Sequence, residues 1–395
     1  MVGHSLALAL GGAGLDVIVV DRDDPEAALA APYDGRSSAI AYGSRLVLEG
    51  LGSWAAMAPH AEPILDIRVS DGASPLFLHY DHSEVGDEPL GHIVENRAIR
   101  VGLHGRSAEV PAVDLRAPAT LETIEFGAGG VDATLSDGTQ IRASLAVGAE
   151  GRQSGLRQQA GIGVSSWSYR QTGIVCTMGH ERPHRGIAHE RFLPAGPFAV
   201  LPMTDDPSNG HRSSIVWTER EDLAPAMLTL DDAAFSAELG RRFGPWYGDV
   251  KVLGGRWSYP LSLQHAERYI GPRLALVGDA AHAIHPIAGQ GLNLGIRGVA
   301  ALAEVLVEAA RLGLDIGSAD VLERYQCWRR FDAMALVVVT DGLNRLFSND
   351  IAAVRVVRDL GLAAVNAAGP AKRFFMRHAM GVVGDLPRLM KGERL

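Results

Sequence analysis

Cysteine is scarce in this sequence, which has only Cys176 and Cys327 among 395 residues. Two cysteines so far apart exclude a disulfide framework and favour a reducing, cytoplasmic setting. Basic residues are not in excess either, since 37 Lys and Arg stand against 46 Asp and Glu, for a net charge of −9. Because no basic surface dominates, the composition argues against nucleic acid as a main partner.

Long apolar runs are also missing. No stretch reaches the roughly 18 uninterrupted apolar residues that a membrane-spanning helix needs. The apolar start, residues 1–20, contains Asp16 and has neither a basic leading segment nor a small-residue cleavage site, so we do not expect it to act as a secretory signal. With 47% hydrophobic and 21% charged residues, the composition is that of a globular enzyme long enough for two domains.

The most informative segment is residues 274–298, LALVGDAAHAIHPIAGQGLNLGIRG. An apolar run ends at Gly278 and Asp279, a loop with clustered glycines follows, and an amphipathic helix is predicted to begin near Leu292. Free N–H groups at a helix start and glycines without Cβ atoms suit a large polar cofactor. Asp279 is placed to accept hydrogen bonds from sugar-like hydroxyl groups. An ordinary strand–loop–helix connection is the alternative.

The N-terminal segment has the pattern of a dinucleotide-binding unit from its helix onward. Residues 3–10 are predicted to form a helix, and residues 16–20 a buried strand that ends at Asp21. Such a unit runs strand, G-x-G-x-x-G, helix, strand and acidic residue. Gly3 matches the last of those glycines, and we expect the first strand and the other two glycines to precede Met1. A natural start on a divergent helix is the alternative.

The rest of the chain changes from strands to helices. Val131–Leu135 and residues 140–147 are predicted to form a hairpin that leads into a buried strand. Between about 173 and 219, strand-length pieces separated by Pro, Gly and Asp indicate an antiparallel sheet. Residues 231–243 are predicted to be an amphipathic helix, and from about 299 the chain is predicted to be largely helical.

A mid-chain segment completes a family pattern. Gly148-Ala149-Glu150-Gly151-Arg152 follows the buried strand, with a serine and an arginine shortly after it. With the N-terminal glycine and acid, and with the late GDAAH…P…GQG…N segment, it resembles the motifs of the flavoprotein aromatic hydroxylases in order and spacing. Four further strings resemble one branch, the ubiquinone-biosynthesis hydroxylases: residues 34–39 (DGRSSA), 92–97 (HIVENR), 196–202 (GPFAVLP) and 341–347 (DGLNRLF).

The resemblance implies an α/β fold with a Rossmann-like FAD-binding domain, an antiparallel-sheet substrate domain and a helical C-terminal region. In this division the FAD-binding domain is discontinuous. We expect it to combine residues 1–70, 95–165 and 260–340, with residues 71–94 and 166–259 in the substrate domain and 341–395 in the C-terminal region.

The resemblance also implies which residues contact FAD, and these lie in four segments. They are Gly3 and Asp21 at the adenosine half, Arg36 and Arg97 as further contacts, Gly278 and Asp279 at the ribityl–phosphate part, and the ring-facing loop residues Pro286, Gly289, Gln290, Gly291, Leu292 and Asn293. Two positions depart from the family pattern. Glu150 stands where the family has Asp, and Gly298 stands where an acid is usual.

By the same resemblance, the protein hydroxylates the ring of a polyprenyl phenol in ubiquinone biosynthesis, through a flavin hydroperoxide formed with O2. NAD(P)H or a redox protein would supply the electrons. Because this chemistry needs a dry pocket rather than a nucleophile, we expect an apolar channel beside the sheet. We expect the protein in the cytoplasm, peripheral to the inner membrane or in contact with a biosynthetic complex.

Two alternatives stay open beside this function. One is another flavin oxidoreductase on the same scaffold. The other is a non-catalytic or flavin-poor subunit of a biosynthetic assembly, which the departures at Glu150 and Gly298 favour.

Some single residues allow two interpretations. His282 and His285 lack a third partner at metal-ligand spacing, so we expect no metal and a structural His282, with proton transfer as the alternative. Residues 341–347 are either a packing feature or a catalytic one.

Aromatic and basic residues are ambiguous in the same way. Trp217, Phe198 and Leu201 either line the substrate pocket or belong to the core of the sheet. The basic residues around Phe374 and Phe375 form either a solvated helix face or a membrane contact.

Overall fold

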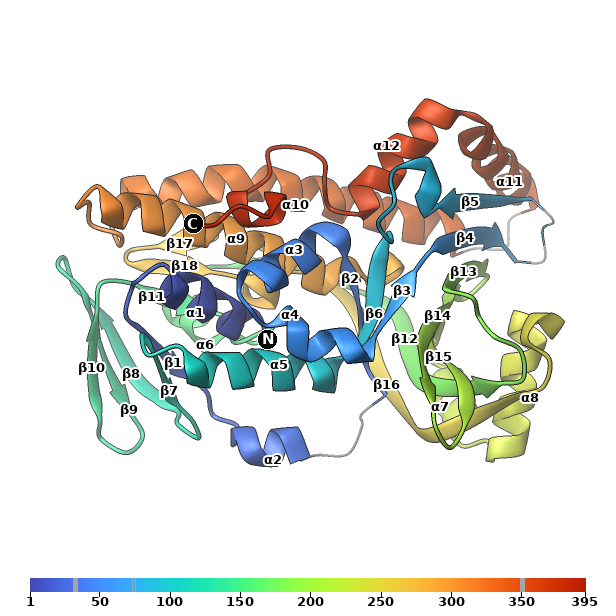
Figure 1. The fold of residues 1–395 in the computed structure, drawn as a ribbon, viewed down its shortest axis with the longest axis horizontal. Helices are drawn as coiled ribbons and strands as arrows, with labels where there is room; N and C mark the ends of the chain where they lie inside the picture. Colours follow the sequence, from blue (N-terminus) through green and yellow to red (C-terminus); the bar gives the residue numbers. More distant parts are fainter. Residues whose placement is uncertain (31–34, 73, 75, 349–351) are drawn as a thin grey trace.

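The computed structural model describes residues 1–30, 35–72, 74, 76–348 and 352–395, and Figure 1 shows its fold. Within these residues the strands form five sheets. Small sheets and their covering helices occupy one end of the molecule, and one large sheet occupies the other (Figure 1). Three C-terminal helices run along the top of this view and reach the large sheet.

Two short parallel strand pairs lie under helices in the first part. The strands are β1 (Val17–Val20) with β7 (Val113–Arg116), and β11 (Ala146–Gly148) with β18 (Leu274–Leu276), which β17 (Ile270–Gly271) extends. The helices are α1 (Val2–Gly12), α5 (Asn96–Glu109) and α9 (Gln290–Arg311). Parallel strands covered by helices are the Rossmann-like arrangement that the sequence predicted.

The predicted hairpin is confirmed, with one difference. β9 (Val131–Leu135) pairs antiparallel with β10 (Gln140–Ala143), and β8 (Leu121–Phe126) completes the sheet. Residues 140–147 are not continuous, because β10 ends at Ala143 and the next three-residue strand joins β18 in another sheet. The chain therefore leaves the hairpin and enters the buried parallel pair within two residues.

The second part is built on an eight-stranded sheet, and the antiparallel strands expected between 173 and 219 are its centre. Its order is β19 (His282–Ala283), β16 (Val250–Ala266), β12 (Val164–His180), β15 (Gly210–Arg220), β14 (Gly196–Asp206), β13 (Ile187–Leu193), β4 (Asp66–Asp71) and β5 (Phe77–Asp81). The pair β4–β13 is parallel. β4 crosses the expected domain boundary at residue 70.

The outer face of this sheet is closed by the predicted amphipathic helix, α8 (Asp232–Phe243). Phe235 and Leu239 of α8 form one apolar cluster with Phe198 and Trp217 of the sheet. Phe198 and Trp217 are 0% and 1% exposed, so they belong to the core rather than to a ligand pocket. Leu201 lies in a different cluster, because its side chain alternates to the inner face.

A small antiparallel sheet and short helices connect the two parts. The strands are β2 (Ser37–Ala41), β6 (Gly91–Glu95) and β3 (Ala61–Ile64), and the helices near them are α3 (Tyr42–Gly50) and α4 (Trp54–Met57). Three other short helices lie elsewhere: α2 (Pro25–Ala30), α6 (Gly155–Gln159) after β11, and α7 (Ala224–Leu228) on the outer side of the large sheet. Asp34, the first residue of the 34–39 string, lies outside the described residues.

The predicted helical C-terminal region is confirmed. It consists of the end of α9 followed by α10 (Ala319–Phe347), α11 (Ala352–Ala367) and α12 (Gly369–Ala379). Phe347 at the end of α10 stacks on Phe192 of the large sheet, with ring centres 4.1 Å apart. No helix in the described part of the chain is long and apolar enough to cross a membrane.

Candidate functional site

The carboxyl ends of three strands place the acidic and glycine-rich turns at one edge of the parallel pairs. Asp21 follows β1, Ala149 follows β11, and Gly278 lies shortly after β18. Ligands of such sheets bind outside the carboxyl ends of the strands. The sheet topology thus selects this edge as the candidate site.

Close backbone approaches hold these turns against the first turn of α1. A Cβ at Gly3 would lie 3.4 Å from the Ala149 Cβ, and a Cβ at Gly278 would lie 3.2 Å from the Val2 side chain. Val2 also packs against Gly295 of α9. Asp21 lies near the same turn. Burial lowers the pKa of His4 in α1 to about 4, and the charge of Asp21 is close enough to oppose this decrease. Gly3, Gly278 and Asp21 are therefore brought together.

Asp279 lies at this edge beside Arg152. Its side chain is 49% exposed, and its carboxylate Oδ2 is 3.8 Å from Arg152 Nε. The surrounding protein raises the pKa of Asp279 by desolvation, and the Arg152 charge opposes the rise. Arg152 also donates to the Ser262 hydroxyl of β16 at 2.6 Å. An accessible carboxylate with few partners of its own can accept hydrogen bonds from ligand hydroxyl groups.

Buried Arg157 fixes the turn that carries Asp279. It is 4% exposed and donates to the Ala280 carbonyl at 3.0 Å and to the Arg152 carbonyl at 2.7 Å. The mid-chain motif includes Arg157, but the sequence could not predict its hydrogen bond to Ala280, which is 123 residues away. Arg157 is a positioning residue for the site.

Glu150, the first departure from the family pattern, has a local structural role. Its carboxylate accepts hydrogen bonds from the Ser154 hydroxyl at 2.5 Å and from the Leu156 N–H at 3.2 Å. The longer side chain folds back over the first turn of α6 and supplies hydrogen bonds there. At the second departure, a Cβ on Gly298 would lie 3.7 Å from the Tyr325 hydroxyl, which donates to the Leu276 carbonyl.

The predicted ring-facing loop ends at the start of α9. Gly289 has a φ of +61°, a left-handed conformation, and a Cβ there would lie 2.9 Å from Ala39 of β2. A Cβ at Gly291 would meet nothing within 4 Å among the described residues. Pro286 is exposed, and Gln290 and Leu292 are partly exposed. The loop thus presents an open backbone edge.

Asn293 secures this loop to β2. Its amide accepts a hydrogen bond from the Ala41 N–H at 2.9 Å and donates to the Ala39 carbonyl at 2.8 Å. The side chain is therefore committed to the protein. Asn293 can shape the loop and can offer a ligand only its backbone.

Arg36 and Arg97 come together on the opposite side of the loop. Both are exposed, and the Asn96 N–H joins their segments by donating to the Arg36 carbonyl at 3.0 Å. Arg36 lies over the ring of Tyr259 on β16, 5.6 Å from its centre, and Arg97 donates to the Leu29 carbonyl at 3.1 Å. The Tyr259 contact brings Arg36 to the inner face of the large sheet, whereas Arg97 is held beside α2.

The two loop histidines are buried and neutral. Burial lowers the pKa of His282 to about 3 and that of His285 to about 4. His282 belongs to β19, and His285 packs edge-on against Tyr169 with ring centres 5.0 Å apart. Over the residues that the structure describes, no group of three His, Cys, Asp or Glu is placed to hold a metal ion.

The 341–347 string packs α10 onto the large sheet. Asp341 accepts hydrogen bonds from Trp167 at 3.2 Å and Tyr169 at 3.0 Å, and Asn344 donates to Gln171 at 3.1 Å. These partners are alternate residues of β12, which match the turns of the helix. The packing interpretation of this string therefore explains its residues.

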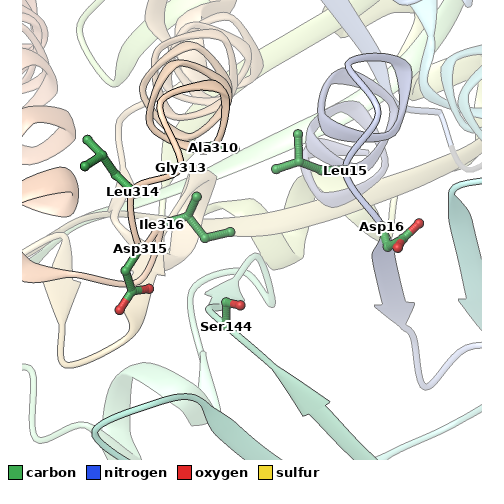
Figure 2. A pocket seen from close by; sticks show the side chains of 8 residues that line it. All are labelled: Leu15, Asp16, Ser144, Ala310, Gly313, Leu314, Asp315 and Ile316. Atoms are coloured by element: carbon green, nitrogen blue, oxygen red, sulfur yellow. The ribbon is translucent and has the colours of Figure 1, made fainter.

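A cavity of about 400 Å³ lies at the other end of the parallel strands (Figure 2). Asp16, which precedes β1, Ser144, which precedes β11, and Ile316, which follows α9, line it. The cavity is therefore at the amino ends of the strands. Because the acidic and glycine turns are at the carboxyl ends, this cavity is not the candidate cofactor site.

The carboxyl-edge site has features that suit FAD. Neither α1 nor α9 has a side-chain cap on its first turn in the described structure, so main-chain N–H groups remain for an anionic group such as a diphosphate. Asp279 offers a carboxylate for hydroxyl groups, and the open edge at Gly291 admits a flat ring. The residues present fit the cofactor that the resemblance implied.

Solved structures of low sequence identity share the fold of this chain. The p-nitrophenol 4-monooxygenase of Pseudomonas putida superposes with a TM-score of 0.78 over 97% of this chain and 96% of that chain, at 19% identity. An FAD complex of HpxO from Klebsiella pneumoniae superposes with a TM-score of 0.73. These likenesses concern the fold, which is that of the flavin-dependent monooxygenases.

The sequence comparisons identify the family. The FAD binding domain family matches residues 1–340. The chain is 53% identical to the ubiquinone hydroxylase UbiL of Rhodospirillum rubrum, over 100% of this chain and 91% of that protein, and 36% identical to the 3-demethoxyubiquinol 3-hydroxylase of Escherichia coli, over 97% and 96%. The chain therefore belongs to the FAD-binding family of ubiquinone-biosynthesis hydroxylases and is an FAD-dependent monooxygenase.

Proposed function

We propose that this enzyme inserts one oxygen atom of O2 into the ring of a prenylated phenol that is a precursor of ubiquinone. The observation that carries the proposal is the proximity of the glycine loop at Gly289 to the apolar inner face of the large sheet. Asn293 fixes the loop to β2, and Arg36, just before β2, contacts Tyr259 of the large sheet. When bound, FAD activates O2 with electrons that NAD(P)H or a redox protein supplies.

The residues of the carboxyl edge would hold FAD in four places. Gly3 and Asp21 would bind its adenosine half, Arg36 and Arg97 would contact it, and Gly278 and Asp279 would bind the ribityl–phosphate part. Main-chain groups of Pro286, Gly289, Gln290, Gly291, Leu292 and Asn293 would lie along the ring. A contact of Arg152 supports this assignment, since Arg152 lies beside Asp279 and also donates a hydrogen bond to Ser262 of the large sheet.

The same contacts support the expected discontinuous FAD-binding domain. Residues from 1–70, 95–165 and 260–340 meet at the carboxyl edge, through Gly3, Ala149 and Gly278. The sheet of 166–259, with segment 71–94, would bind the substrate, and residues 341–395 would cover it. β4 (Asp66–Asp71) extends the substrate domain slightly into the first segment.

The purified enzyme is expected to carry FAD and to convert 2-prenylphenol into a product that is one oxygen atom heavier. Asp279→Ala is expected to weaken FAD about 10- to 100-fold, because it removes hydrogen bonds to a charged acceptor. FAD fluorescence gives the affinity and mass spectrometry gives the product. Asp137→Ala, at an exposed turn, is the control and should bind FAD normally. A colourless protein that takes up no FAD would instead support the flavin-poor alternative.

We further propose that the enzyme lies on the surface of an anionic membrane, where a prenylated substrate dissolves. Residues 333–339 of α10 (AMALVVV) are an unbroken apolar run on both sides of the helix, and Phe331, Val338 and Val339 are 82%, 67% and 53% exposed. A helix that is apolar all round is normally covered on all sides. Nearby α12 exposes Phe374 and Phe375 and contains basic residues but no acidic residue, which favours an anionic partner.

Phe331→Ser/Val338→Ser is expected to reduce binding to phosphatidylglycerol-containing vesicles at least tenfold in a sedimentation assay. Each exposed side chain contributes about 1–3 kcal/mol when it enters an apolar phase. Leu312→Ser is the matched control, because Leu312 is 73% exposed at the end of α9. Equal vesicle binding by the wild type, Phe331→Ser/Val338→Ser and Leu312→Ser would contradict a membrane-binding surface. The proposal would also be contradicted if Phe331→Ser/Val338→Ser kept its vesicle binding and only turned a dimeric enzyme into a monomer.

A further inference from the structure

One lateral row of side chains crosses the inner face of the large sheet. Residues directly opposite each other on paired strands share a face. By this register the row runs through seven strands and consists of Trp257, Val175, Val216, Ala199, Glu190, Val69 and Leu78. Six of the seven are apolar or aromatic. Glu190 is the single charged residue in the row.

The neighbours of Glu190 on β13 confirm that its side chain points inward. His189 lies edge-on against Phe243 of α8, and Arg191 donates to the Phe243 carbonyl at 2.6 Å, so both face the outer side. Phe192 stacks on Phe347 of α10, on the inner side. Because side chains alternate along a strand, Glu190 shares the inner face with Phe192.

At one end of this row, the inner face lies next to the segment that leads into β2, to which the predicted ring-facing loop is bound. Trp257, at the far end of the row, packs against Gly35, and Tyr259 two residues on lies under Arg36. Trp257 and Glu190 are separated by four strand spacings, or about 19 Å at ~4.8 Å each. The apolar floor between them consists of the small side chains Val175, Val216 and Ala199.

Glu190 lies between two apolar clusters and has no ionic partner. One cluster contains Phe192, Phe347 and Leu362, and the other contains Ala188 and Met376. Within the described chain no hydrogen bond or ion pair to the Glu190 side chain is found. The residue is partly exposed rather than fully buried.

The charged groups around Glu190 do not compensate it. On β4 the nearest acid by register is Asp71, two positions beyond Val69, and Arg358 of α11 pairs with it at 2.8 Å. On α12, Lys372 is paired with Glu84 at 2.5 Å. The residues that neighbouring β14 places on this face, Pro197, Ala199, Leu201 and Met203, are all uncharged. Burial alone raises the pKa of Glu190 to about 7.

We propose that Glu190 binds the hydroxyl group of the phenolic substrate and accepts its proton during hydroxylation, an inference that rests on the proposed function. As a ring electron pair forms the new C–O bond to one oxygen atom of O2, the O–O bond breaks, and its electron pair leaves with the other oxygen atom, which ends as water with the two electrons that the donor of the proposed function supplies. In the same step the phenol O–H bond breaks. Its electrons stay on the phenol oxygen, and the proton moves to the Glu190 carboxylate. No other oxidant is needed. An unpaired carboxylate in an apolar site is suited to this transfer because it is only weakly stabilised as an anion.

The test uses 4-nitrophenol, whose phenolate form is yellow. The compound is bound to the FAD-loaded enzyme, and difference spectra recorded at a series of pH values measure its ionisation. In the wild type, Glu190 and the bound phenol would share one proton, so the phenol ionises at a pH at least one unit higher than in Glu190→Gln, a tenfold change in its ionisation constant. The pH profile of 2-prenylphenol hydroxylation should rise near pH 7 and lose this rise in the variant. Glu125→Gln, on an exposed strand of another sheet, is the matched control and should behave as the wild type.

Each outcome decides the proposal. A shift that is lost in Glu190→Gln and kept in Glu125→Gln supports it. Equal phenol titrations in the wild type and Glu190→Gln overturn the role of Glu190 and leave the proposed function intact. Failure of folded wild type to bind any phenol overturns both. Glu190→Asp, with a shorter carboxylate, should restore part of the pH shift, which a purely structural role would not do.

Discussion

Asp71→Ala is expected to lower the free energy of unfolding by about 3–5 kcal/mol, because it leaves Arg358 as a buried charge without its partner. Asp71 and Arg358 are 5% and 3% exposed, and their side chains meet at 2.8 Å between Oδ2 and Nε. Arg358 also donates to the Phe347 carbonyl at 3.1 Å. The pair therefore joins α11 to the edge of the large sheet beside Glu190. Urea unfolding followed by tryptophan fluorescence measures the loss.

A surface pair provides the matched control for this prediction. Arg220 and Asp222 form an equally short ion pair, but each side chain is 62% exposed. Asp222→Ala should change stability by less than about 1 kcal/mol. The double variant Asp71→Leu/Arg358→Met should recover most of the lost stability, because it removes both charges and keeps the volume. Equal losses in Asp71→Ala and Asp222→Ala would contradict a buried, structural pair.

Glu190→Gln is expected to stabilise the enzyme at pH 8 by about 2–3 kcal/mol and to leave its stability at pH 4.5 nearly unchanged. Burial raises the pKa of Glu190 from 4.5 to about 7 in the folded state. Between these values the folded state binds more protons than the unfolded state. The free energy of unfolding of the wild type therefore falls as the pH rises from about 4.5 to 7, and glutamine abolishes this contribution.

The measurement compares urea midpoints of wild type and variant at several pH values. Taking the difference between the two proteins cancels other titrating groups, such as Asp279, whose pKa is also raised, and His282, whose pKa is lowered. Glu125→Gln should give a difference near zero at every pH. A constant difference between pH 4.5 and 8 would mean that Glu190 titrates normally and lies in a polar setting.

Much of the fold could be predicted because its signals are local. The strand before Asp21, the hairpin at Val131–Leu135 and the long helices have periodicities that depend only on neighbours in sequence. The prediction that this strand is buried was wrong: Ile18 and Val20 are 43% and 37% exposed, because β1 pairs only with β7 in a two-stranded sheet. The break after Ala143 could not be predicted, because the apolar pattern of residues 140–147 does not reveal that two halves pair in different sheets. The parallel position of β4 beside β13 had no sequence signal either, since it depends on a contact between distant segments.

The cofactor site was predictable as a set of motifs but not as a set of contacts. Gly278, Asp279 and Gly289 were recognisable from residue type and spacing. The commitment of the Asn293 side chain to Ala39 and Ala41, and the bridge from Arg157 to Ala280, join residues more than 100 positions apart. Such pairs leave no trace in one sequence. The family resemblance implied a cofactor contact for Asn293, and the structure shows that its side chain is hydrogen-bonded to β2.

By itself, the sequence determined the cofactor class and the family, because glycines, an acid and a helix start in fixed order are required wherever a backbone must approach a flat, charged cofactor. The tertiary structure alone decided what faces the substrate. In the string His189-Glu190-Arg191-Phe192, alternation assigns two faces but cannot say which is inside. That depends on the pairing of β13 with strands that begin at Asp66 and Gly196 and on the helices that close the outer side. The position of the Glu190 carboxylate in an apolar row depends on the pairing of seven strands, which one sequence does not reveal.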